Sequence, residues 1–274
     1  MEQNDSMNKV REIQLGELTL LESYIDLCKR HDLRYYALGG TLLGAIRHKG
    51  FIPWDDDIDL AMPRKDFMKL VELSKGLKDE KYEFFFFSQD SGYLLPYGKF
   101  VNKQTFIDSQ FSKDEVLKHL WIDIMPMDGL PENERLVRKI YRKAEFYRQI
   151  IKLCNAKLGE GKTLLKKYAK YIFKPIAMLY GKKRAINNLN MLALTYDYDS
   201  SKYIGAVSCG LYGIGERMLK SEAENSVLVD FETGKFNSFG CWDSYLTGLY
   251  GNYMQLPPKE KQVTHSMKAW VDDD

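Results

Sequence analysis

The sequence lacks any long apolar run. The four consecutive phenylalanines at 84–87 fall far short of the roughly 18 to 20 residues that span a bilayer, so no membrane-spanning helix is expected. Cysteine is scarce, with four residues scattered along the chain and no CxxC pair, which favours reduced thiols over a disulfide framework or a zinc site. No apolar stretch follows a basic one in residues 1–15, which predicts a cytoplasmic protein without a secretory signal.

The chain also lacks a strong net charge. Its 40 lysines and arginines against 38 aspartates and glutamates leave a formal charge of +2, which argues against a strongly basic nucleic-acid-binding protein. The charge is unevenly distributed, because residues 135–184 hold sixteen lysines and arginines against two glutamates, a net +14, and the rest of the chain carries −12. We therefore expect a basic helical surface beside an acidic part, and no nucleic acid as partner.

The hydrophobic pattern predicts an α/β (α+β) body with an added basic helical region. Apolar residues recur at helical intervals between Asn8 and His31, and 131–194 is again helical, apart from breaks at glycine and proline. Polar and apolar residues alternate in 57–62, as in a strand with its carboxylates on one face. The other expected elements are helices at 41–48 (capped by Thr41) and 63–74, and strands at 33–38, 82–87, 97–101, 105–108 and 121–125.

A glycine pair, Gly39 and Gly40, ends the expected strand at 33–38 and opens a helix at Thr41. Glycine lets the backbone approach a ligand closely, and a helix N-terminus offers unpaired N–H donors to an anion. The same pair could serve only a tight turn, so the motif alone does not establish a phosphate site.

Four aspartates follow within five positions. Asp55, Asp57 and Asp59 share parity, so on an extended backbone they project from one face. Such a cluster repels itself unless a cation neutralises it, and Mg²⁺ or Mn²⁺ with oxygen ligands is the natural counter-charge. The alternative is an acidic helix cap or a solvated loop, against which stands the alternation with apolar residues.

Asp123 stands alone in the apolar segment 121–125. A carboxylate in a buried strand must be paired, hydrogen-bonded or bound to metal, so Asp123 is a candidate third ligand or the base that deprotonates an acceptor hydroxyl. A core aspartate satisfied by backbone donors or an arginine remains the alternative. Asp128, just before Gly129 and Pro131, is predicted to be a turn residue.

These residues carry a family resemblance. A Gly-Gly turn ahead of an Asp-x-Asp strand, with a lone aspartate on a later strand, resembles the polymerase beta-like nucleotidyltransferase fold, which has a mixed sheet. The string GGTLLGAIRHKGFIPWDDDIDLAMPRKDF, with WIDIMPMDGLP and YGNYMQLPPKEKQVTH further on, is similar to the LicD family, which includes the fukutin-related glycan phosphotransferases. The likeness touches most of the chain except the basic helices.

The resemblance implies residue roles and a reaction. Asp57, Asp59 and Asp123, with Asp55 beside them, would hold Mg²⁺ or Mn²⁺, and the turn at 39–41 would contact donor phosphates. The implied reaction moves phosphocholine, or a similar phospho-alcohol, from CDP-choline or another CDP-alcohol to a sugar hydroxyl of a teichoic acid or lipopolysaccharide precursor, releasing CMP. Two rivals remain: a nucleotidyltransferase that releases pyrophosphate, and a non-catalytic nucleotide- or glycan-binding module.

Further binding residues are predicted from their chemistry. Arg47 and Lys99 are candidates for donor phosphate oxygens, with a solvated loop end and a surface lysine as the alternatives. A quaternary ammonium is best held by aromatic faces, although most aromatics are simply core residues. The candidates for this cage are Trp54, Tyr35, Tyr36, Trp121 and Tyr97.

The expected organisation has three parts. A nucleotidyltransferase-like catalytic core covers 1–130, a basic helical region covers 131–200, and a C-terminal segment, 201–274, packs back on the core. The basic stretch 135–184 is a candidate surface for an anionic, lipid-linked glycan acceptor or for the inner face of the membrane, with solvated helices as the alternative.

Overall fold

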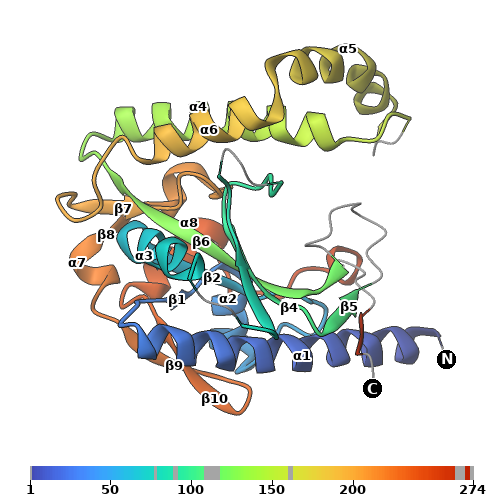
Figure 1. Ribbon diagram of the computed structural model, residues 1–274, viewed down its shortest axis with the longest axis vertical. Coiled ribbons are helices and arrows are strands. Elements are labelled where there is room, and N and C mark those ends of the chain that lie inside the picture. The colour runs from blue at the N-terminus through green and yellow to red at the C-terminus, as the bar shows by residue number, and fades with distance from the viewer. Residues whose placement is uncertain are drawn as a thin grey trace.

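Helices alternate with strands over residues 2–74, and among the described residues four strands then follow one another before a helix begins at Glu134. The computed structural model describes residues 2–76, 79–88, 92–107, 118–159, 163–262 and 269–271 (Figure 1). The helices are α1 (Glu2–Arg30), α2 (Gly39–His48), α3 (Arg64–Ser74), α4 (Glu134–Asn155), α5 (Leu164–Tyr180), α6 (Lys182–Ala193), α7 (Lys220–Ala223) and α8 (Trp242–Tyr250), with 3₁₀ turns η2 (Gly213–Glu216) and η3 (Lys259–Lys261).

The strands are short except for one. They are β1 (Tyr36–Ala37), β2 (Asp59–Pro63), β3 (Tyr82–Phe85), β4 (Gly98–Asn102), β5 (Thr105–Ile107), β6 (Leu120–Leu130), β7 (Tyr203–Gly205), β8 (Met218–Leu219), β9 (Val227–Phe231), β10 (Gly234–Ser238) and β11 (Ala269–Val271). The main sheet has the order β1-β2-β6-β4-β3, and β6 continues past it to pair with β7, which pairs with β8. Only β2 and β6 run parallel among the pairs described, so the sheet is mixed and the predicted α+β class is confirmed.

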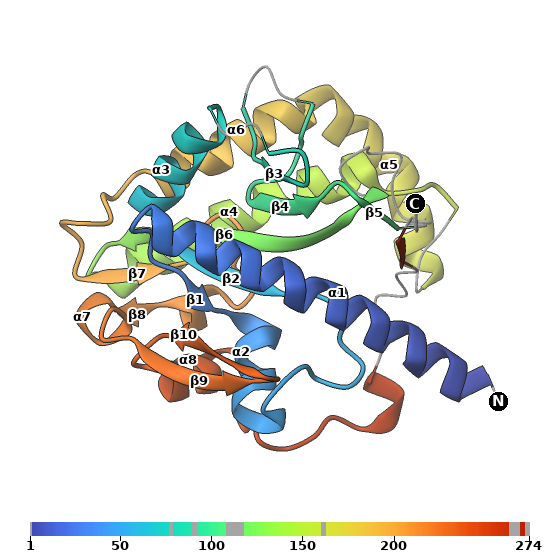
Figure 2. The same cartoon turned by 60° about the horizontal axis from the view of Figure 1, so that its bottom comes forward.

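Helices pack on the sheet and beside it. Figure 2 shows α1 crossing it, while α4, α5 and α6 form a separate layer at the top of Figure 1. The α1 contact is apolar, since Leu21 and Tyr24 are fully buried in one cluster with Leu60 and Ile122 of the central strands. Among the described residues, no helix is long and apolar enough to cross a membrane.

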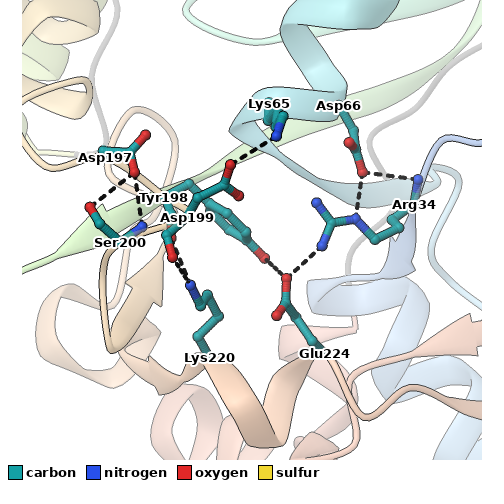
Figure 3. Close-up of polar contacts among 9 residues, drawn as sticks. All are labelled: Arg34, Lys65, Asp66, Asp197, Tyr198, Asp199, Ser200, Lys220 and Glu224. Carbon is teal, nitrogen blue, oxygen red and sulfur yellow. Dashed lines mark hydrogen bonds and ion pairs between the residues drawn. The ribbon is translucent and has the colours of Figure 1, made fainter.

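The C-terminal part returns to the first half through a polar network around Arg34 (Figure 3). The Arg34 guanidinium donates to Asp66 of α3 over 2.7 Å and to Glu224, which follows α7, over 2.6 Å. Tyr198 donates its hydroxyl to the same Glu224 oxygen. One arginine therefore links the start of the core to segments almost 200 positions away.

Most predicted elements are present with shifted bounds. The predicted helix at 8–31 begins at Glu2, and the strand predicted at 33–38 is reduced to the two residues of β1 that pair with β2. The strand predicted at 121–125 extends over β6, since its second half pairs with β7. The strand expected at 105–108 pairs with β11, away from the main sheet, and Asp108 lies outside the described residues.

Candidate active site

Three neighbouring strands place a row of charged side chains on one face of the sheet. Asp123 of β6 has a register partner on each neighbouring strand. Asp59 of β2 lies on one side of it, and Lys99 of β4 lies on the other. Register partners point to the same face of a sheet. The Lys99 ammonium lies 2.5 Å from Asp123 Oδ1 and is itself buried. The row therefore reads carboxylate, carboxylate, ammonium.

The chain leading into β2 extends this row into a cavity of about 310 Å³. Asp55, Asp57 and Asp59 all line it, together with Gly39 and Gly40. Asp56, between them in sequence, is fully buried. The three alternating aspartates thus line one cavity, although only Asp59 lies in β2.

Negative charge dominates this site. Burial raises the pKa of Asp59 well above its ordinary value, and repulsion from Asp57, Asp123 and Asp55 adds to the effect. Burial also raises the pKa of Asp123, although Lys99 opposes it. Burial lowers the pKa of Lys99 in turn, against the attraction of Asp123. The nearby lysine thus does not balance the aspartates.

The glycine pair packs against the carboxylates. Gly39 has φ +50°, and a Cβ there would lie 3.5 Å from Asp59 Oδ2. A Cβ on Gly40 would lie 2.7 Å from Asp55 Oδ2, closer than real Cβ contacts allow. The predicted Thr41 cap is wrong: α2 begins at Gly39 without a side-chain cap, and the Thr41 hydroxyl instead accepts the Asp59 N–H over 2.8 Å.

Several predicted binding residues lie away from the cavity lining. Arg47 donates to the Tyr253 carbonyl over 2.9 Å, and the Trp54 ring stands edge-on to a neighbouring histidine. Tyr35 and Tyr36 are buried in the two central apolar clusters. None of these four predicted side chains lines the aspartate cavity.

The other two residues of the predicted cage, Trp121 and Tyr97, already contact the Lys99 ammonium. This ammonium lies 4.0 Å from the ring centroid of Trp121 and 5.6 Å from that of Tyr97. Because an ammonium over an aromatic face is held by cation–π attraction, these rings help to keep a buried lysine charged beside Asp123.

The prediction for Asp128 is wrong. It lies within β6, where its fully buried side chain accepts from Arg64 Nε over 2.6 Å. The local Asp-Gly-x-Pro pattern suggested a turn, but pairing of β6 with β7 keeps this segment extended.

Two residues of α1 that lie beside the aspartates, Glu17 and Gln14, were not predicted from the sequence. Glu17 is buried, and neither of its carboxylate oxygens has a hydrogen-bond partner. Burial raises its pKa well above the ordinary value, with added repulsion from Asp57 and other aspartates of the site. One turn earlier, Gln14 donates to the Asp55 carbonyl over 2.8 Å. Nothing in a regular amphipathic helix marks either residue, since their role depends on which face meets the aspartate loop.

The C-terminal half supplies the opposite wall of the cavity. Glu216 accepts the N–H groups of Leu211 and Tyr212 over 3.0 and 3.2 Å. The Tyr212 ring stands edge-on to that of Tyr250, with 5.3 Å between centroids. The lining residues from this half, none of which was predicted, are Ala206, Cys209, Gly210, Leu211, Tyr212, Glu216, Tyr245, Leu249 and Tyr250.

The donor set suits a hard divalent cation in its chemistry. Carboxylate oxygens are the ligands that Mg²⁺ and Mn²⁺ prefer, and their mutual repulsion favours a cation between them. Within the described ranges, no three His, Cys, Asp or Glu side chains are arranged to hold an ion as they are positioned. Binding one would require aspartate side chains to turn toward a common point.

Comparison with known proteins finds a family match over the residues that carry the aspartates. Residues 32–155 match the family described as LicD/FKTN/FKRP, nucleotidyltransferase domain. This match assigns residues 32–155 to the class of nucleotidyltransferase domains. The matched residues contain the Gly-Gly turn, all four aspartates of the loop, Lys99 and Asp123. Within that class, residues 32–155 form a LicD-family domain.

Similarity to one characterised protein extends over nearly the whole chain. The lipopolysaccharide cholinephosphotransferase LicD of Haemophilus influenzae is 29% identical over 267 residues, which cover 94% of this chain and 96% of that protein. Uncharacterised proteins of Rickettsia prowazekii and Rickettsia typhi are 29% and 28% identical over 116 and 123 residues, about 40% of their lengths.

Proposed function

We propose that the protein transfers phosphocholine, or a similar phospho-alcohol, from a CDP-activated donor to a sugar hydroxyl of a lipopolysaccharide- or teichoic-acid-type glycan precursor, releasing CMP. The observation that carries the proposal is the carboxylate row, with Asp55, Asp57 and Asp59 in one cavity and Asp123 in register beside them. The full-length similarity to a cholinephosphotransferase supports the transferred group.

The proposal includes Mg²⁺ or Mn²⁺ held by Asp57 and Asp59, with Asp55 and Asp123 completing the set. The ion would supply charge neutralisation at the donor diphosphate. Gly39 and Gly40 leave room for that diphosphate because they carry no side chain beside the carboxylates. Asp123 is either a further ligand or the group that accepts the proton of the acceptor hydroxyl.

The choline site proposed here lies in this cavity and differs from the predicted cage. A trimethylammonium group cannot donate hydrogen bonds and is bound best by aromatic faces. Tyr212, Tyr245 and Tyr250 line the aspartate cavity, and they are the candidates for this role. A Tyr250→Leu variant should raise KM for CDP-choline more than for CDP-glycerol, which has no ammonium group.

The decisive experiment measures the leaving product. With CDP-choline, Mg²⁺ and a bacterial glycan acceptor, the protein should release CMP, and Asp57→Asn should abolish release while keeping the wild-type melting temperature. Asp26→Asn, an exposed position on α1, is the matched control and should keep full activity. Release of pyrophosphate from CTP would favour the nucleotidyltransferase, and tight CDP-choline binding without turnover would favour the binding module.

We further propose that α5 contacts an anionic membrane surface. Two of its lysines are held against the segment that follows α4, since Lys170 and Lys174 donate to the carbonyls of Lys157 and Ala156. Several of its large apolar side chains are exposed, Leu179 by 90%. The others exposed by half or more are Tyr168, Tyr171, Ile172, Phe173, Ile176 and Met178.

Charge identifies the surface that this helix fits. Three cationic residues, 182–184, follow α5 directly, and the stretch 135–184 carries +14. Apolar side chains beside basic ones are typical of helices that lie in the interface of anionic membranes. Vesicles containing phosphatidylglycerol should bind the protein at low salt. Ile176→Asp should weaken binding and Leu228→Asp, equally exposed on β9, should not; equal binding to neutral vesicles would contradict the charge argument.

A further inference from the structure

A second cavity, of about 620 Å³, borders the aspartate cavity. One side is a face of α4, and the other is the segment 211–214. Leu211 and Tyr212 line both cavities, so they form a shared wall. The α4 residues that line the second cavity are Arg138, Tyr141, Arg142, Glu145 and Arg148.

This second cavity is positively charged. Its charged lining residues are three arginines and one glutamate. The glutamate, Glu145, is paired with one of the arginines, because Arg148 donates two hydrogen bonds to its Oε2 over 3.0 and 3.2 Å. Arg148 is further fixed by a 2.9 Å bond to the Val207 carbonyl. Arg138 and Arg142 remain exposed at the cavity, and among the described residues the only carboxylate paired with either is Glu134, 4.0 Å from Arg138.

The shared wall has a fixed shape. Glu216, which lines the aspartate cavity, accepts both backbone N–H groups of the wall, and the Tyr212 ring is braced against Tyr250. Leu211 is 75% exposed, so it presents an apolar ridge between the two cavities. A ligand lying across this ridge would have one end at the aspartates and the other at the arginines.

We propose that the arginine cavity binds an anionic group, a phosphate above all, on the sugar acceptor. The inference rests on the proposed transferase function and narrows its acceptor to a phosphorylated or otherwise anionic saccharide. Arginine suits this role because its planar fork donates two hydrogen bonds to phosphate oxygens. The volume lies in the range of small-molecule sites. The donor diphosphate belongs on the aspartate side, where a cation and the glycine pair would receive it, which leaves the arginines for the acceptor.

The test uses binding, so that it does not depend on turnover. Glucose 6-phosphate, glucose and CDP-choline with Mg²⁺ are titrated calorimetrically at up to millimolar concentration into the wild type and an R138A/R142A variant. We expect wild-type protein to bind glucose 6-phosphate at least tenfold more tightly than glucose, and the variant to lose that preference without a change in the Kd of CDP-choline. A K139A/K143A variant removes two exposed charges of α4 that do not line the cavity, and should bind like the wild type.

The outcomes separate this inference from the proposed function. Wild-type protein that does not bind glucose 6-phosphate, or binds it equally after loss of the arginines, overturns the inference. A tenfold weaker Kd for CDP-choline in R138A/R142A also overturns it, because the cavity would then serve the donor. Failure of the proposed function shows differently, as absent CMP release in the wild type while the glucose 6-phosphate preference persists. Asp57→Asn should keep that preference and lose CDP-choline binding.

Discussion

Glu216 should make the stability of the protein depend on pH. Burial raises the pKa of its carboxyl from 4.5 to about 7, against the hydrogen bonds from Tyr212 and Leu211, which lower it. The folded protein therefore holds this proton more tightly than the unfolded chain does. The stabilisation is fully present below pH 4.5, where both states are protonated, and is lost as the pH rises to about 7.

The magnitude follows from the two pKa values. One pH unit corresponds to about 1.4 kcal/mol, so the passage from 4.5 to about 7 should remove about 3 kcal/mol of unfolding free energy. Glu216→Gln is neutral at every pH and keeps an oxygen that can accept the same two N–H groups. Its stability relative to the wild type should therefore improve by about 3 kcal/mol between acidic and alkaline pH.

Urea unfolding followed by tryptophan fluorescence measures this difference. The series runs from pH 4 to pH 8 in EDTA, which removes any change in metal binding with pH. Glu222→Gln, at an exposed position on the neighbouring α7, is the control and should stay within about 0.5 kcal/mol of the wild type. A stability difference between Glu216→Gln and the wild type that does not vary with pH would refute the reasoning.

Three further predictions concern single residues. Gly40→Ala places a Cβ 2.7 Å from Asp55 Oδ2 and should lower CMP release roughly 100-fold, whereas Gly76→Ala, whose Cβ has ordinary room, should not. Arg64→Met leaves Asp128 buried without its partner and should cost about 3 to 5 kcal/mol in urea unfolding, while Lys65→Met at an exposed pair should have no measurable effect. Glu17→Gln keeps the size of the carboxyl group, whose uncharged form burial favours, and should keep the melting temperature at pH 7, whereas Glu17→Ala, which opens a cavity, should lower it.

Sequence reasoning succeeded where a short period determines the geometry. The alternation of Asp55, Asp57 and Asp59 was enough to place all three on one cavity, and a lone aspartate in an apolar segment was enough to indicate that Asp123 is buried beside a partner. It did not indicate that Lys99 is this partner, because that depends on the register between β4 and β6. Most lysines are exposed, so a sequence offers no reason to bury this one.

The remaining site residues could not be predicted for a topological reason. Glu17 and Tyr250 lie far apart in sequence, and each lies near the aspartates only because α1 crosses the sheet and α8 packs against α2. Among many tyrosines no local pattern separates those of the cavity from those of the core, and Tyr35 and Tyr36, predicted as cage residues, are core residues. A sequence motif thus identifies the side of the site that one chain segment builds, and it misses the side assembled from distant segments.

The uneven charge of the sequence corresponds to two cavities of opposite charge. An acidic cavity and a basic one meet at the ridge of Leu211 and Tyr212. Salt should affect the two sides differently, because the Debye length falls from about 8 Å at physiological ionic strength to about 3 Å at 1 M, and buried charges are screened less than exposed ones. Arg138 and Arg142 are exposed, whereas Asp59 and Asp123 are largely enclosed. Raising KCl should therefore raise KM for an anionic acceptor more steeply than KM for CDP-choline, and R138A/R142A should remove that difference. Parallel salt dependence of the two constants in the wild type would place both substrates on the same set of charges.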